Sequence, residues 1–154
     1  MPCGISPLPV AWAGRNCMRA ELFCDSNILL YAASNAPEDA AKRTAAREVL
    51  ARPGVGFSAQ VLQEFYVNAT LKRGLRLSHE EAIAILGALR GFPILPVAEE
   101  LVFAALEVKV RYQVSYWDAA IIAAAEALGA RELYTEDLNA GQVYGSVRVV
   151  NPFK

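Results

Sequence analysis

Histidine and cysteine are scarce in this sequence of 154 residues, which limits the chemistry available to it. The one histidine, His79, lies in the segment SHEE, so a mechanism that uses two histidines as acid and base is excluded. The three cysteines, Cys3, Cys17 and Cys24, lack the spacing of a metal site, and their odd number leaves one thiol unpaired. We therefore expect a reducing, cytoplasmic environment.

The sequence also lacks an uncharged apolar run of about 18 residues, the length that spans a bilayer. The best candidate, YWDAAIIAAAEALGA, contains Asp118 and Glu126, so it predicts a buried helix and no contact with a membrane. Hydrophobic residues make up 55% of the chain, and the mean hydropathy is +0.25. At this length, the composition indicates one domain with a sizeable core.

The first 17 residues lack both a periodic apolar pattern and the basic start of a signal peptide. Two prolines interrupt their short apolar part. We expect a disordered N-terminal extension over residues 1–17 and a folded domain over residues 18–154.

Charge is unevenly distributed, although the net charge is only −1. Residues 80–107 contain five acids and one base, Arg90. Residues 42–76 contain two acids, Glu48 and Glu64, and seven bases. A basic half of this kind either meets a polyanion or forms solvated helix faces, and the sequence leaves both interpretations open. The seven bases are Lys42, Arg43, Arg47, Arg52, Lys72, Arg73 and Arg76.

Short apolar segments alternate with longer amphipathic ones. Strands are expected at residues 20–25, 55–58, 92–97, 130–135 and 146–152. Helices are expected at residues 27–33, 38–51, 58–74, 78–91, 98–113 and 115–128, with Ser58 starting the third, Gly74 ending it, and a Ser78–Glu81 capping box on the fourth. This alternation predicts an α/β fold with a mainly parallel sheet of about five strands covered on both faces.

Asp25 is the one charged residue in FCDSNILLY, an apolar segment apart from this acid and the small polar residues that follow it. No lysine or arginine lies between Arg19 and Lys42, so this carboxylate needs a distant cation, a metal or water. Asp25 ends the first expected strand, and Asp137 follows the fourth in LYTEDLNAG. Because ligands bind at the carboxyl ends of parallel strands, both acids are expected at one such edge.

Two further acids are candidates for the same edge. Glu64 borders the apolar stripe of its helix, with Asn68 one turn further on, and Asp118 lies in the first turn of SYWDAAIIAAAEALG. Each acid also has a purely structural interpretation. Asp118 could cap its helix with Ser115, Asp137 could belong to a turn, Glu64 could be plain surface, and Asp25 could cap the next helix.

The stretches FCDSNILLYA, SAQVLQEF, SYWDAAIIAAAEALGA and LYTEDLNAGQ, followed by VRVVNPF, resemble the PIN-domain family, and within it the VapC-like toxins of bacterial toxin–antitoxin pairs. The resemblance runs from about residue 20 to the end and implies a three-layer PIN-like domain. It implies that Asp25, Glu64, Asp118 and Asp137 are catalytic in RNA cleavage. Within this quartet, Asp25, Asp118 and Asp137 would bind Mg²⁺, or alternatively Mn²⁺.

The resemblance also assigns small polar positions beside these acids to Ser26, Asn27 and Thr135, with Glu136 as a possible extra ligand. A carboxylate cluster suits magnesium better than zinc, independently of any family. Repulsion among carboxylates should raise the pKa of at least one of them in the metal-free protein.

The expected partners are an RNA substrate, a second copy of the chain in a homodimer, and a cognate antitoxin. Alternatives are a non-catalytic metal-binding, RNA-binding or protein-binding module and a PIN nuclease that acts in RNA processing. A phosphoacceptor receiver would need a paired acid after the first strand and a lysine at the end of a later strand, and the lysines of this sequence do not fit that pattern. A haloacid-dehalogenase-like phosphatase would need an aspartate where Asn27 stands.

Overall fold

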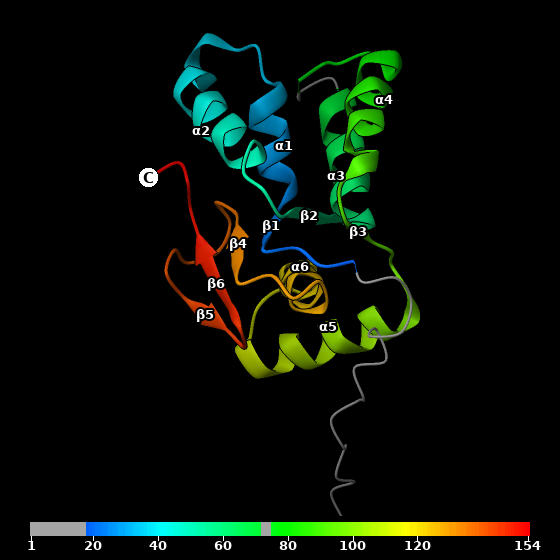
Figure 1. Cartoon of the computed structure of the whole chain (residues 1–154), viewed down its shortest axis with the longest axis vertical. Coiled ribbons are helices and arrows are strands. Elements are labelled where there is room, and N and C mark those ends of the chain that lie inside the picture. The colour runs from blue at the N-terminus through cyan, green and yellow to red at the C-terminus, as the bar shows by residue number, and fades with distance from the viewer. Residues whose placement is uncertain (1–17, 72–74) are drawn as a thin grey trace, which may run out of the picture.

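A six-stranded sheet forms the middle layer of the computed structural model, which describes residues 18–71 and 75–154 (Figure 1). The strand order is β3-β2-β1-β4-β6-β5, and every neighbouring pair is parallel except β5 and β6. The strands are β1 (Leu22–Cys24), β2 (Val55–Ser58), β3 (Ile94–Leu95), β4 (Glu132–Tyr134), β5 (Val143–Tyr144) and β6 (Val147–Val150). The expected α/β class and mainly parallel sheet are confirmed.

Within the described ranges, six α-helices cover the sheet. One face carries α6 with α5 outside it, and the other carries α1 to α4 (Figure 1). The α-helices are α1 (Ser26–Ala33), α2 (Ala40–Leu50), α3 (Ala59–Thr70), α4 (His79–Ala88), α5 (Glu99–Tyr112) and α6 (Tyr116–Ala127), and the 3-10 turns are η2 (Pro37–Asp39) and η3 (Leu89–Gly91). No helix within the described residues is both long enough and apolar enough to cross a membrane.

Local signals explain most helix boundaries. The hydroxyls of Ser58 and Ser115 accept hydrogen bonds from backbone amides in the first turns of α3 and α6. Ser78 and Glu81 form the expected capping box on α4. The expected end of α3 at Gly74 is wrong, because the helix ends at Thr70, whose hydroxyl donates to a carbonyl of the preceding turn. Gly74 itself lies outside the described residues, as do residues 1–17.

The sheet has one strand more than the five segments that the sequence indicates, and the additional strand is β5. Its two residues pair antiparallel with β6 across a turn at Gly145, where φ is +59°. Two residues are too few to produce a recognisable alternation of apolar and polar side chains. The strand expected over residues 92–97 is limited to β3, since Pro93 and Pro96 cannot donate to a neighbouring strand.

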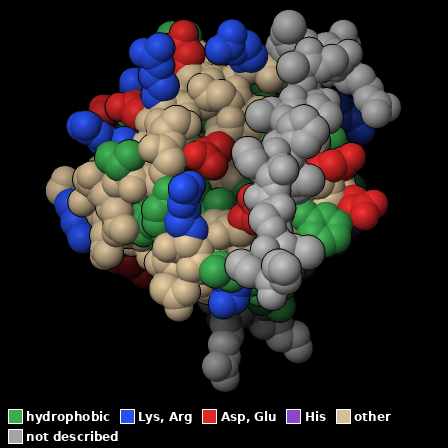
Figure 2. Space-filling model, turned by 90° about the horizontal axis from the view of Figure 1, so that it is seen from below, with side chains coloured by type: hydrophobic (Ala, Val, Ile, Leu, Met, Phe, Trp, Pro, Cys, Tyr) green, Lys and Arg blue, Asp and Glu red, His purple; other side chains and the backbone are tan. Residues whose placement is uncertain are grey.

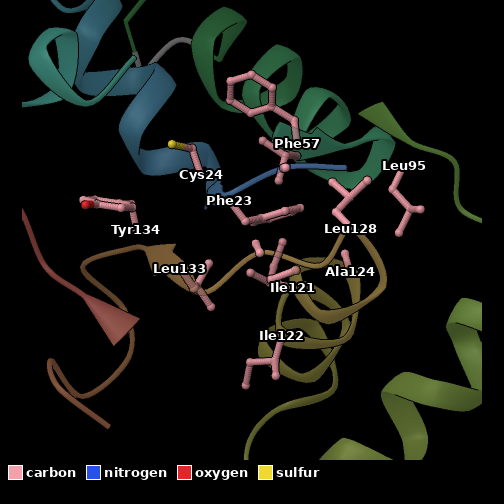
Figure 3. Close-up of a cluster of buried hydrophobic side chains, with 14 of the residues drawn as sticks. Phe23, Cys24, Phe57, Leu95, Ile121, Ile122, Ala124, Leu128, Leu133 and Tyr134 are labelled. Carbon is pink, nitrogen blue, oxygen red and sulfur yellow. The ribbon is translucent and has the colours of Figure 1, made fainter. Parts of the chain in front are cut away.

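The main core lies between the sheet and α6 (Figure 3). The ring of Phe23 extends from β1 toward Ile121 and Ala124 of α6, whereas Cys24 points to the opposite face (Figure 3). Alanines on α6 allow the helix to approach the strands closely. Gly56 of β2 serves the same close packing.

Gly56→Ala should destabilise the protein by about 1–3 kcal/mol through overpacking. A Cβ atom at residue 56 would lie 2.6 Å from the Cβ of Ala20 and 3.1 Å from Cδ1 of Leu128, and both residues are buried. Gly87→Ala is the control, because no atom lies within 4 Å of its added Cβ and alanine favours a helix. Urea unfolding should show a loss for the first variant and none for the second. Equal stabilities would contradict this packing.

Candidate active site

The order in which the chain adds strands to the sheet reverses between β1 and β4. From β1 the chain adds β2 and β3 on one side, then returns to place β4 and β6 on the other. Such a switch point leaves a crevice at the carboxyl ends of the two strands, where ligands bind in open α/β folds. Cys24 pairs in register with Tyr134, so Asp25 and Thr135 directly follow the strands at this crevice.

Asp25 is only 6% exposed. It is the N-cap of α1, since its Oδ1 accepts a hydrogen bond from the Ser26 backbone amide at 2.6 Å. Its Oδ2 accepts from the Thr135 hydroxyl at 2.8 Å. The capping interpretation of Asp25 is therefore confirmed. Within the described part of the chain no ion pair involves this carboxylate, so neutral donors alone hold a buried acid.

Thr135 is fully buried and connects three parts of the site. Besides donating to Asp25, its Oγ1 accepts from Asn27 Nδ2 and from the Asp137 backbone amide, each at 3.1 Å. Asn27 Nδ2 also donates to Asp137 Oδ2 at 3.1 Å. Asp25 and Asp137 are thus joined by a short network of side chains from α1 and the segment after β4.

Glu64 comes to the same site from α3. Its Oε2 accepts from the Ser26 hydroxyl at 3.0 Å, and its Oε1 accepts from Gln60 Nε2 at 2.8 Å. Gln60 is buried and was not anticipated from the sequence. Gln60 lies one helical turn before Glu64, and residues four apart share one face of a helix. This spacing is the feature of the sequence that could have indicated Gln60 as a partner of Glu64.

Asp118 lies near this network without a hydrogen bond to it. Its backbone amide donates to the Ser115 hydroxyl, and that hydroxyl donates to Asp118 Oδ2 at 2.7 Å, which confirms the helix cap. The charge of Asp118 nevertheless contributes to raising the pKa of Asp137. The four acids therefore share one electrostatic environment, with Asp118 at its margin.

Two further expected residues lie beside the network without a hydrogen bond to its carboxylates. Asn68 is exposed, and its amide donates to the backbone carbonyl of Glu64 rather than to a carboxylate. Glu136 accepts hydrogen bonds from Tyr31 and Lys42 at the rim of the site. Neither contact was foreseen, because the partners of Glu136 lie about a hundred residues earlier in the chain.

Burial raises the pKa of Asp25 to about 6, and the charges of Glu64 and Asp137 add to the effect. Hydrogen bonds from Thr135 and Ser26 oppose it. The pKa of Asp137 is raised as well, first by partial burial and then by Glu136, Asp118 and Glu64. The expected rise in a carboxyl pKa is confirmed, but loss of hydration contributes more to it than the repulsion among carboxylates from which the rise is expected.

The donor chemistry of the site suits a hard cation that keeps part of its water shell. Within the described residues, no three acidic, histidine or cysteine side chains converge closely enough to hold a metal ion unaided. Magnesium commonly binds through only one or two carboxylates and several waters. Asn27 Oδ1 is fully buried and meets no hydrogen-bond donor among the residues that the structure describes, an arrangement that costs free energy and is typical of functional sites.

A groove of about 720 Å³ adjoins the acids between α1, the segment after it, and the α3–α4 region. Asn27 and Glu136 line it next to the site, and Asn68 lines it on α3. Leucines of α1 and of the α3–α4 connection form its apolar part: Leu30, Leu71, Leu75 and Leu77.

The fold and the site together define an α/β domain with clustered acids at a switch point. A family model for the PIN domain matches residues 22–145, so the chain belongs to the PIN-domain family. No match is found among curated proteins.

Solved structures with this fold include toxins of toxin–antitoxin pairs. A toxin–antitoxin complex from Klebsiella pneumoniae is 21% identical with a TM-score of 0.65, covering 86% of this chain and 98% of that chain. VapC20 of Mycobacterium tuberculosis, a toxin that cleaves the sarcin–ricin loop, is 22% identical with a TM-score of 0.58, covering 75% and 91%. The DNA-bound VapBC of Salmonella typhimurium is 17% identical with a TM-score of 0.59, covering 84% and 96%. At these identities the likeness shows the fold.

In metal-free protein, the free energy of unfolding should fall as the pH rises from about 4 to 7. The unfolded Asp25 carboxyl titrates near its ordinary pKa of 3.8 and the folded one near 6. The folded, charged form is therefore disfavoured by roughly 3 kcal/mol at neutral pH, and this contribution is absent below pH 4. Asp25→Asn should remove that part of the decline. Urea unfolding of both proteins in chelator would check this, and identical pH profiles would contradict it.

Proposed function

We propose that this protein is a magnesium-dependent ribonuclease that hydrolyses RNA phosphodiester bonds and acts as the toxin of a type II toxin–antitoxin pair. The observation that carries the proposal is the network joining Asp25, Glu64 and Asp137 at the switch point of a PIN domain. A structural neighbour described as a toxin that cleaves the sarcin–ricin loop supports RNA as the substrate.

Asp25, Asp118 and Asp137 would hold the metal together with its bound waters, since the three side chains do not converge closely enough to hold it unaided. Manganese is an alternative to magnesium. The bound ion would supply a water of lowered pKa and stabilise the leaving oxygen. Thr135 and Ser26 fix the Asp25 carboxylate, and Gln60 and Ser26 fix that of Glu64. These contacts hold the carboxylates in one orientation before substrate arrives, which is the main requirement of such a site. The ring of His79 contacts the Tyr66 hydroxyl, and no acid in this proposal relies on it.

An antitoxin and a second copy of the chain are the proposed protein partners. The structural neighbours from Klebsiella pneumoniae and Salmonella typhimurium are complexes of a toxin with its antitoxin. On α5, Phe103, Leu106 and Val110 expose large apolar side chains at helical spacing, which supports a homodimer. Figure 2 shows the α5 side of the molecule, where hydrophobic side chains are mixed with charges of both signs.

Asp25→Asn and Asp118→Asn should each reduce RNA cleavage by about 1000-fold or more, because several kcal/mol of metal-dependent stabilisation is lost. Gel assays of a labelled RNA in magnesium would measure the rates, and circular dichroism should remain unchanged. The control Glu107→Gln removes an exposed acid on α5 and should keep full activity. Normal cleavage by both aspartate variants, or by the parent protein in chelator, would overturn the proposal in favour of another role.

Magnesium should stabilise the parent protein by about 2.7 kcal/mol at a hundredfold excess over its Kd, because it binds only the folded state. In Asp118→Asn the metal-free protein should melt at a higher temperature, since one repelling charge is gone, and magnesium should shift the melt less. Glu107→Gln should respond like the parent. The measurement is thermal unfolding at neutral pH with chelator or magnesium. Equal magnesium shifts in the parent and in Asp118→Asn would exclude Asp118 as a ligand.

A further inference from the structure

At the rim of the acid site, Lys42 of α2 is held by two side chains from other segments. Its Nζ donates to Tyr31 Oη at 2.8 Å and to Glu136 Oε2 at 2.9 Å. The Tyr31 hydroxyl donates in turn to Glu136 Oε1 at 2.8 Å, so the three groups form a closed triangle. The ammonium also lies 4.3 Å from the centre of the Tyr31 ring and 5.4 Å from that of Phe153. Lys42 is therefore fixed in position rather than extended freely into solvent.

This triangle borders both the acids and the groove. Tyr31 and Glu136 line the groove, and Glu136 directly precedes Asp137. Among the described residues that line the groove there are three acids and no lysine or arginine. A polyanion that reaches the acids would meet repulsion along this path. Lys42, which contacts two of the lining residues, supplies a positive charge next to it.

The contacts of Lys42 leave it able to bind another anion. An ammonium has three donors, and Tyr31 and Glu136 occupy two of them. The Lys42 side chain is 38% exposed and that of Glu136 is 28% exposed, so their ion pair is partly screened by water and costs little to break. Hydrogen bonds between an ammonium and a phosphate are charge-assisted and strong.

We propose that Lys42 positions the substrate RNA by exchanging its bond to Glu136 for a bond to a backbone phosphate beside the scissile one. Tyr31 and Phe153 hold the ammonium in place during the exchange. Glu136 acts as a competitor that neutralises Lys42 when no RNA is bound. This inference rests on the proposed ribonuclease function and adds to it a positioning residue and the chemical group that it contacts.

The test measures RNA binding apart from cleavage. All variants carry Asp25→Asn to keep the RNA intact, and a short fluorescein-labelled single-stranded RNA of mixed sequence is titrated in magnesium at several salt concentrations. Lys42→Gln, which keeps most of the side-chain stem, should flatten the slope of log Kd against log salt by about 0.7, the value for one phosphate contact on a single strand. Lys42→Arg should keep the slope. The matched control Lys109→Gln removes an exposed positive charge on α5 and should leave the slope unchanged.

Glu136→Gln separates the exchange from a general change in charge. It should tighten RNA binding, and the gain should disappear when it is combined with Lys42→Gln, because the released ammonium is what binds the phosphate. A gain that is equal in both backgrounds would overturn the exchange. In the absence of Asp25→Asn, Lys42→Gln should raise KM and leave kcat unchanged. Thermal melts of each variant exclude loss of folding.

The outcomes distinguish this inference from the function on which it rests. If the parent protein cleaves RNA but Lys42→Gln has the parental salt slope, or Lys109→Gln flattens the slope equally, Lys42 does not contact phosphate and only this inference fails. If the parent protein cleaves no RNA and the Asp25→Asn protein binds none, the ribonuclease function itself fails.

Discussion

The hydrogen bond from the Thr135 hydroxyl to the Asp25 carboxylate is the interaction on which the site depends. It joins the residues that follow β1 and β4, at the switch point where the order of the strands reverses. The same hydroxyl accepts from Asn27 and from the Asp137 amide, so all of its hydrogen-bonding capacity is used. A single buried oxygen thereby fixes two acids that are separated by more than a hundred residues in the sequence.

The fold tolerates a local loss of stability in order to keep this arrangement. Burial of Asp25 raises its pKa to about 6, and the buried Asn27 Oδ1 has no donor within the described part of the chain. Both features would be costly in an ordinary core. Their cost is offset by the apolar packing between the sheet and α6 (Figure 3). Unfavourable local features of this kind are expected where a site is built to bind a ligand.

The rim of the site differs from its centre. In the centre, Asp25, Thr135 and Asn27 are buried and make short contacts among themselves. At the rim, Lys42 and Glu136 are partly exposed, and their ion pair can open at little cost. Fixed groups at the centre suit the orientation of reacting atoms, whereas exchangeable groups at the rim suit the binding and release of a long charged substrate.

Much of this protein was determined by local sequence. Ser58, Ser78 and Ser115 start their helices through contacts within one turn, and the alternation of elements predicted the parallel sheet. The positions of Asp25 and Asp137 after strands predicted their shared edge, because parallel strands align their carboxyl ends. The tertiary structure alone decided the pairing of β5, the diversion of Glu136 to Lys42, and the marginal place of Asp118. These depend on contacts between distant segments, whose distances and angles are set by packing and not by the spacing of residues along the chain.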